Sequence, residues 1–302
     1  MSLSEDLRDE LAAIVPRRRC CRLAELSALF HAAGAWHLQG RGELAVELDL
    51  GSAAAARRAF ALLRGLGIRS EIRTYRRRAF EQATRYQLRV EVDPRAADVM
   101  RDAGVLDRRG APLERPPKRV VGRSCCRAAY LRGALLGAGS LSGPRAPHLE
   151  LRTSGPEGAA LLAAIAAREG VRLKTLERRT HAAAYAKGGE TIADLLALAG
   201  ASETALRLDE HQVVAATSAE ANRLANADEA NVRRTVNAAR EQLEAIDRLD
   251  LTRLPKALRE IAELRRSHPS LSLTELAARC NPPITKAAAH HRMQSLKKRA
   301  GL

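Results

Sequence analysis

The sequence predicts an α+β protein in which two pseudo-symmetric halves, each with the element order αββαββα, precede an all-α domain. Three observations support this. One segment occurs twice, segments with helix and strand periodicity follow each copy in a similar order, and a basic, helix-patterned region closes the chain. The expected parts are a first half at 1–106, a linker at 107–122, a second half at 123–202, a helical connector at 203–250 and a final domain at 251–302.

The repeated segment reads CCRLAELSALFHAAG at residues 20–34 and CCRAAYLRGALLGAG at residues 125–139. At a fixed offset of 105 positions the copies share seven residues, among them both adjacent cysteines and the final glycine. Apolar residues fall at helical spacing in both copies, and we expect Gly34 and Gly139 to end each helix in the left-handed conformation. Because only two copies occur, the pattern predicts a duplicated domain and not a solenoid.

The remaining elements of the first half follow from periodicity and capping residues. We expect Ser4 to cap a helix over 3–15 and Ser52 to cap a helix over 52–67. A third helix, over 94–104, begins with a proline in its first turn. Alternating apolar residues predict strands at 43–50, 68–75 and 85–92.

The second half repeats this order. Its expected strands lie at 147–154, 171–179 and 181–187, and its further helices at 155–170 and 190–200. The Pro- and Arg-rich linker between the halves is expected to be extended. Residues 203–250 are polar with helical periodicity, which predicts a long solvent-facing helix or a helix pair.

The C-terminal region has the pattern of a helix-turn-helix. A helix at 255–267 is followed by a capping box at Ser272 and Glu275, and then by a break at 281–283 where two prolines stand together. The last helix, over 285–301, carries one apolar seam, which Ala289, Met293, Leu296 and Ala300 form, and residues 284–299 are its expected recognition segment. The alternative interpretation is a basic helical tail with a solvated polar face.

Positive charge concentrates in this region. The chain has a net charge of +16, and residues 252–302 hold eleven Lys and Arg against three Glu, which is half of the excess. We therefore expect DNA as a partner, with the last helix reading base edges in the major groove. The candidate DNA-contacting residues of this helix are Thr285, Lys286, Ala287, His290, His291, Arg292, Gln294, Lys297 and Lys298.

Basic residues also recur along the predicted strands. Alternation places them in pairs on common strand faces. They are Arg69, Arg73, Arg85, Arg89, Arg172 and Lys174. These residues are candidates for a basic sheet that faces DNA, but a solvated antiparallel face would carry arginines as well, and the pattern alone favours neither interpretation.

Composition argues against several other classes. Aromatic residues make up 3% of the chain, too few for base-stacking recognition. The five cysteines include two adjacent pairs that do not match a CxxC motif, so we expect buried thiols and neither a metal site nor a disulfide framework. His290 and His291 diverge by about 100° on a helix, which argues against a shared metal. A cytoplasmic, nucleoid-associated protein without signal peptide or membrane span is expected.

The two repeated helices resemble the signature helices of LAGLIDADG homing endonucleases, which pack at a pseudo-twofold axis. In that family the residue before the final glycine is the Asp that holds the catalytic metal. Ala33 and Ala138 occupy these positions here, and a methyl group cannot ligate Mg²⁺. The resemblance therefore implies a nuclease scaffold without its catalytic residues.

The whole chain is similar to one family in particular, the WhiA sporulation and cell-division regulators of Gram-positive bacteria, in which a degenerate LAGLIDADG duplication precedes a helix-turn-helix. The matching stretches are YLRG at 130–133, GSL at 139–141, the Asn-rich segment at 222–231, PPITK at 282–286 and HRM at 291–293. Three alanines at 287–289 replace the family's usual Ser-Gly-Val, which removes a hydroxyl near the expected DNA surface.

This resemblance implies a sequence-specific transcription regulator of cell-division and sporulation genes that is not an enzyme and needs no cofactor. It also implies promoter DNA, a WhiB-type iron–sulfur regulator and RNA polymerase as partners. Two alternatives stay open. An active metal-dependent endonuclease would need other carboxylates, for which Glu25, Glu43, Glu47 and Asp49 are the candidates. Alternatively, the duplicated domain is a ligand-binding or protein-docking module that regulates the helix-turn-helix.

Overall fold

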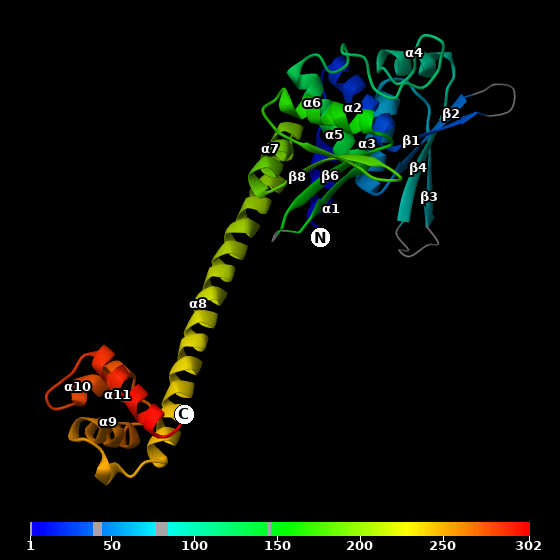
Figure 1. The fold of residues 1–302 in the computed structure, drawn as a ribbon. Helices are drawn as coiled ribbons and strands as arrows, with labels where there is room; N and C mark the ends of the chain where they lie inside the picture. The colour runs from blue at the N-terminus through cyan, green and yellow to red at the C-terminus, as the bar shows by residue number, and fades with distance from the viewer. Residues whose placement is uncertain (1, 39–43, 77–83, 144–145) are drawn as a thin grey trace. The chain divides into compact units, whose positions relative to one another are not determined.

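The computed structural model describes residues 2–38, 44–76, 84–143 and 146–302 (Figure 1). The chain divides into two compact units, Met1–Ala216 and Thr217–Leu302. The first unit holds both halves of the duplication, and the second holds the C-terminal helices. Helix α8 (Ser202–Asp247) runs from the first unit into the second, so residues 203–250 form mainly one long helix and not a helix pair.

The first half has the expected order αββαββα, preceded by helix α1 (Leu3–Ala13). Its elements are α2 (Arg19–Ala33), β1 (Gly34–Leu38), β2 (Leu44–Leu50), α3 (Ala53–Gly65), β3 (Glu71–Arg76), β4 (Thr84–Glu91) and α4 (Pro94–Asp102). The strands form an antiparallel sheet in the order β1-β2-β4-β3. Periodicity alone did not predict the position of β1, which begins at the glycine that ends α2.

The second half repeats the order and the sheet topology. Its elements are α5 (Ser124–Ala138), β5 (Gly139–Ser142), β6 (His148–Thr153), α6 (Pro156–Ala167), β7 (Lys174–Glu177), β8 (Ala182–Lys187) and α7 (Gly189–Ala199). The strand order is β5-β6-β8-β7, again antiparallel. The equivalent sheets confirm the predicted α+β duplication.

Helices α2 and α5 pack against each other in one hydrophobic core that spans both halves. Leu26, Leu29 and Leu131 are completely buried there. The two backbones approach closely at Gly133, because a Cβ at this position would overlap the carbonyl oxygen of Glu25. A small residue therefore sets the separation of the two central helices.

Two local predictions about helix ends are wrong. Helix α1 is capped by Ser2, which forms a capping box with Glu5, whereas the Ser4 hydroxyl donates to a backbone carbonyl of β5 (2.8 Å). Gly34 and Gly139 are not left-handed, because their φ angles are −83° and −76°. Each glycine instead lets the chain pass from a helix directly into a strand, where a Cβ would crowd the carbonyl four residues earlier.

The linker at 107–122 folds against the first unit and is not a free extended segment. Val120 and Val121 are buried in the core. The Leu113 carbonyl oxygen lies 3.0 Å from Nε2 of His31 in α2. Apolar burial and this polar contact hold the segment in place despite its proline content.

The second unit is helical, with a core of its own. After α8 come a 3-10 turn at Leu251–Arg253 and the helices α9 (Lys256–Ser267), α10 (Leu273–Arg279) and α11 (Lys286–Arg299). Ile261, Leu276 and Leu296 are buried between them. The predicted capping box of Ser272 and Glu275 is present at the start of α10. Among all described helices, none combines the length and the apolar character that crossing a membrane requires.

Replacing Gly133 with Ala tests the close approach of α2 and α5. The added methyl group must push the helices apart, so we expect the free energy of unfolding to fall by about 1–3 kcal/mol, although alanine is the better helix former. The matched control is Gly143→Ala, where a Cβ would meet no atom within 4 Å. Urea denaturation measures both variants, and equal stabilities would contradict the packing argument.

Candidate nucleic-acid interface

One buried seam orients helix α11. Ala289, Met293 and Leu296 are at most 1% exposed, as the apolar spacing predicts. The Thr285 hydroxyl caps the helix by accepting a hydrogen bond from the Ala288 amide (3.2 Å). The opposite face of α11 is therefore exposed from its first turn onward.

Helices α9 and α10 hold the turn that leads into α11. The backbone N–H of Asn281 donates a hydrogen bond to the side-chain carboxylate of Glu260 in α9 (2.6 Å). The Ile284 amide donates to the Ala277 carbonyl oxygen of α10 (3.0 Å). Helix α10, this turn and α11 thus form a helix-turn-helix, with α9 packed against both helices.

Most of the sequence candidates of α11 lie on its exposed face. They are Thr285, Lys286, Ala287, His290, His291, Gln294 and Lys298. Together with Arg299, the two lysines Lys286 and Lys298 carry the exposed positive charge of the helix. The face therefore combines amide, imidazole and cationic groups, the types that bind base edges and phosphates.

Two of the candidate DNA-contacting residues of α11 form ion pairs within the second unit. Arg292 Nη1 lies 3.6 Å from a carboxylate oxygen of Glu260, and Lys297 Nζ forms an ion pair with Glu241 of α8. Their charges are thus partly compensated inside the protein. Sequence reasoning missed both glutamates, because no local pattern relates them to the last helix.

The outer face of the first sheet carries mixed charge. Strand register places Arg89 opposite Glu47 on β2 and opposite Glu71 on β3. Arg85 Nη2 lies 2.8 Å from a carboxylate oxygen of Asp49. The mixed charge favours the second of the two interpretations for this half, a solvated antiparallel face, because alternation brings acidic side chains of the neighbouring strands to the same side.

The other two arginines of this half do not change that result. Arg73 on β3 pairs with Glu71 (2.9 Å). Arg69 is exposed but precedes β3, so it lies outside the sheet. The structure thus does not bring the four arginines of the first half into one basic surface.

The outer face of the second sheet has more positive than negative charge. Register and alternation place Lys174 of β7, Lys187 of β8 and Arg152 of β6 on this face, together with the acidic Glu150. Arg172 is exposed just before β7. Sequence reasoning missed Lys187, although the alternation in its predicted strand would have placed it.

Glu150 is surrounded by donors on this face. Its carboxylate oxygens lie 3.0 Å from Arg152 Nε, 3.5 Å from His148 Nε2 and 3.7 Å from His181 Nε2. Burial alone would raise the pKa of Glu150, but the hydrogen bonds from Arg152 and His148 hold the pKa below its usual value. The ionised carboxylate therefore neutralises Arg152, and the two lysines supply the remaining positive charge.

The C-terminal ends of α2 and α5 carry no carboxylate. Ala33 and Ala138 are the last helical residues, and each precedes the glycine that begins the next strand. The helices stay close at this end, because a Cβ on Gly137 would lie 3.6 Å from the Ala33 Cβ. The two positions at which the sequence resemblance would place metal-binding carboxylates thus offer only methyl groups.

Among the substitute carboxylates, Glu25 is completely buried in an ion-pair triad. Its two oxygens accept hydrogen bonds from Arg58 Nε (2.7 Å) and Arg132 Nε (2.9 Å). Arg132 also donates to the Ala199 carbonyl oxygen (3.0 Å). The triad joins the two halves, so Glu25 has a structural role and is shielded from a solvent-borne metal.

The remaining substitute carboxylates contact neighbouring side chains or lie outside the described residues. Glu47 accepts a hydrogen bond from Gln87 (2.6 Å), and Asp49 is paired with Arg85. Glu43 lies outside the described residues. In the part of the chain that the structure describes, carboxylates form no group of three that could hold a metal ion.

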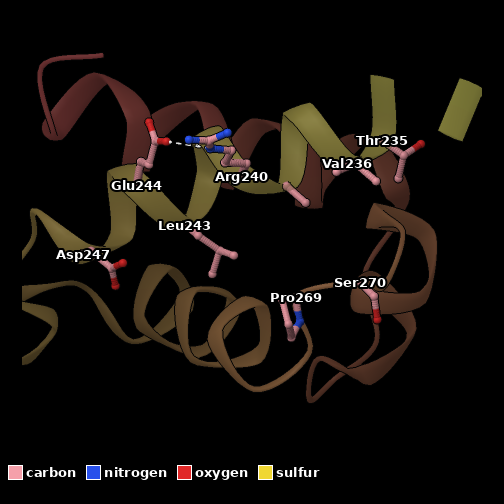
Figure 2. Close-up of a pocket in the computed structure, with 9 residues that line it drawn as sticks. Thr235, Val236, Arg240, Leu243, Glu244, Asp247, Pro269 and Ser270 are labelled. Carbon is pink, nitrogen blue, oxygen red and sulfur yellow. Dashed lines mark hydrogen bonds and ion pairs between the residues drawn. The ribbon is translucent and has the colours of Figure 1, made fainter. Parts of the chain in front are cut away.

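A groove in the second unit runs between the C-terminal part of α8 and the loop after α9 (Figure 2). Val236, Leu243 and Pro269 line it. An ion pair between Arg240 and Glu244 (3.2 Å) lies along it, as the dashed line in Figure 2 shows. A largely apolar lining with a neutralised ion pair fits neither phosphate binding nor acid–base catalysis.

Three segments match the domains of one protein family. Residues 19–106 match the WhiA N-terminal LAGLIDADG-like domain, 127–217 the WhiA LAGLIDADG-like domain and 221–300 the WhiA C-terminal HTH domain. The chain belongs to the WhiA family. The family's three domains correspond to the two halves of the duplication and to the C-terminal helices of the structure.

Similarity to WhiA proteins extends over the whole chain. The probable cell division protein WhiA of Heliobacterium modesticaldum is 36% identical and aligns with 98% of this chain and 95% of its own length. That of Acidothermus cellulolyticus is 38% identical, over 98% of this chain and 92% of its own. The crystal structure of full-length DUF199/WhiA from Thermatoga maritima has a TM-score of 0.59 at 24% identity, covering 100% of this chain and 98% of that one. These matches confirm the predicted family and fold.

Replacing Glu25 with Gln tests the buried triad. The change leaves two buried arginines without their counter-charge, so we expect the free energy of unfolding to fall by about 3–5 kcal/mol. The control is Glu71→Gln, which removes an ion pair at the surface and should change stability little. Urea denaturation compares the two variants. A loss for Glu25→Gln no larger than for the control would rule out a structural role of the triad.

Proposed function

We propose that this protein is a sequence-specific DNA-binding regulator of transcription whose nuclease-like unit does not cleave DNA. The observation that carries the proposal is the exposed face of α11, held by a buried seam and capped at Thr285. A rigid helix with polar and basic side chains on its free face is what major-groove recognition requires.

The side chains of α11 divide into two roles. Gln294 is the type of residue that binds adenine N6 and N7, and Lys286 in the first turn is suited to guanine O6 and N7. Lys298 and Arg299 lie near the C-terminal end and are suited to phosphate oxygens. Arg292 and Lys297 contribute less in this proposal, because each is paired with a glutamate of the second unit.

The duplicated unit adds a second, sequence-independent surface in this proposal. Lys174 and Lys187 on the outer face of the second sheet, with Arg172 beside it, supply phosphate contacts. The first sheet contributes little, because Arg73 and Arg85 are paired with acidic side chains and Arg89 lies opposite Glu47 and Glu71. Contacts of this kind strengthen binding without reading the sequence.

Family membership supports a proposal for the regulated genes and the partners. The relatives are named probable cell division proteins, and the family resemblance described above adds sporulation, so we include cell-division and sporulation genes as the regulated set. Promoter DNA is the direct partner, and a WhiB-type iron–sulfur regulator and RNA polymerase are the proposed protein partners. The bacterial nucleoid is the proposed location.

Alanine substitutions on α11 test the DNA-binding face. Genomic fragments enriched by the full-length protein define the motif, and fluorescence anisotropy then measures affinity against salt concentration. We expect Lys298→Ala to reduce the slope of log K against log salt by about one, and Gln294→Ala to reduce discrimination against a mismatched base by about 1–3 kcal/mol. Arg57→Ala, at an exposed arginine of α3, is the charge-matched control. An equal change in the salt slope for Lys298→Ala and for the control would contradict the assignment of α11 as the recognition helix.

A plasmid-nicking assay tests the proposed lack of cleavage. The full-length protein is incubated with supercoiled plasmid that carries the enriched motif, in Mg²⁺ or Mn²⁺. We expect no relaxed or linear product, because methyl groups replace the metal-binding carboxylates at Ala33 and Ala138. The Glu47→Gln variant serves as control: cleavage by the wild type that this variant lacks would establish the endonuclease alternative.

A further inference from the structure

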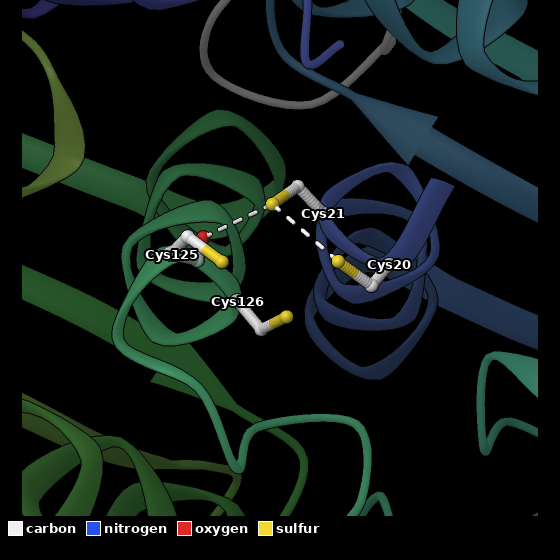
Figure 3. A group of neighbouring side chains, drawn as sticks. All are labelled: Cys20, Cys21, Cys125 and Cys126. Carbon is white, nitrogen blue, oxygen red and sulfur yellow. Dashed lines mark hydrogen bonds between the residues drawn. The ribbon is translucent and has the colours of Figure 1, made fainter. Parts of the chain in front are cut away.

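Four of the five cysteines lie together at the N-terminal ends of α2 and α5 (Figure 3). Cys20 and Cys21 are the second and third residues of α2, and Cys125 and Cys126 occupy the same positions in α5. All four sulfur atoms lie within 4.8 Å of one another. The two halves of the duplication thus contribute equally to one thiol cluster.

The spacing of the sulfur atoms suits a single metal ion. Tetrahedral zinc with Zn–S distances of about 2.3 Å places its sulfur ligands about 3.8 Å apart. The Sγ atoms of Cys20 and Cys21 are 4.0 Å apart and no two of the four sulfur atoms are more than 4.8 Å apart, so side-chain movements of about 1 Å or less reach this geometry. A two-iron cluster would need its two thiolate pairs on opposite sides of an Fe₂S₂ core, and so farther apart.

The surroundings of the cluster favour negative charge. The N-cap residues Arg18 and Arg123 make no side-chain capping bond, so the positive ends of both helix dipoles face the cysteines. Arg18 Nη1 also lies 3.8 Å from Cys125 Sγ. Four thiolates around a divalent cation carry a net charge of about −2, which these positive groups offset.

The cluster is protected but accessible. Cys21 and Cys126 are buried, whereas Cys20 and Cys125 are half-buried and thus partly open to solvent.

We propose that Cys20, Cys21, Cys125 and Cys126 bind one Zn²⁺ ion as a structural tetrathiolate site. Two ligands come from each half, so the ion ties the N-terminal ends of α2 and α5 together. The sequence-based expectation of no metal treated each adjacent pair alone, without the spatial pairing that the duplication creates. The proposal is independent of DNA binding by α11, which lies in the other unit.

Metal content of the purified full-length chain tests the proposal. The protein is prepared under reducing conditions with zinc, and zinc per chain is measured by elemental analysis and native mass spectrometry. We expect about one ion in the wild type, and its loss in the Cys20→Ser, Cys125→Ser double variant. The matched control is Cys280→Ser, which alters the remaining cysteine, in the second unit, and should leave the zinc content unchanged.

Two measurements on the wild-type chain do not depend on the folding of a variant. Cobalt added to the metal-free protein should produce the intense visible bands of tetrahedral cobalt thiolate. Zinc should protect the four clustered cysteines from alkylation and leave the reactivity of Cys280 unchanged. Zinc at background level in the wild type, together with a weak octahedral cobalt spectrum, would overturn the proposal. Disulfides formed in air with no zinc retained under reducing conditions would overturn it as well, in favour of a redox role.

Discussion

The contact between α2 and α5 is the constraint on which the first unit depends. Gly133 allows the backbones to approach, and Glu25 is then enclosed between Arg58 and Arg132. Separating the helices would expose leucines and break a buried charge network at the same time, so the two halves behave as one core. Both sheets are attached to these helices through the glycines that begin β1 and β5, and their faces are oriented accordingly.

Charge compensation decides which surfaces of the protein remain basic. The arginines of the first sheet lie beside Glu47, Asp49 and Glu71, and the net charge of the chain therefore resides elsewhere. On α11, glutamates of the second unit likewise pair with Arg292 and Lys297, whereas Lys286 and Lys298 stay exposed. A count of basic residues overestimates a binding surface wherever neighbouring strands or helices supply carboxylates.

Local signals in the sequence predicted much of the fold. Ser52 and the pair Ser272–Glu275 cap their helices as expected, because a capping bond spans only three residues. Strand β1 was missed, since no turn separates it from α2. The candidate site depends more on long-range contacts. The apolar seam of α11 was enough to predict which face of the helix is exposed. The ion pair of Arg292 with Glu260 and the cysteine cluster depend on tertiary contacts, which sequence periodicity does not encode.

The alanines at the ends of α2 and α5 have a consequence for how this fold is held together. Two acidic side chains facing each other across a narrow helix contact repel, and a scaffold that carries them relies on a bound cation to offset the repulsion. Ala33 and Ala138 place small apolar groups at that contact, so its closure does not depend on magnesium. The end of the helix pair that would carry the catalytic carboxylates in a nuclease is thus closed by small apolar side chains, which present no charge for a cation to offset.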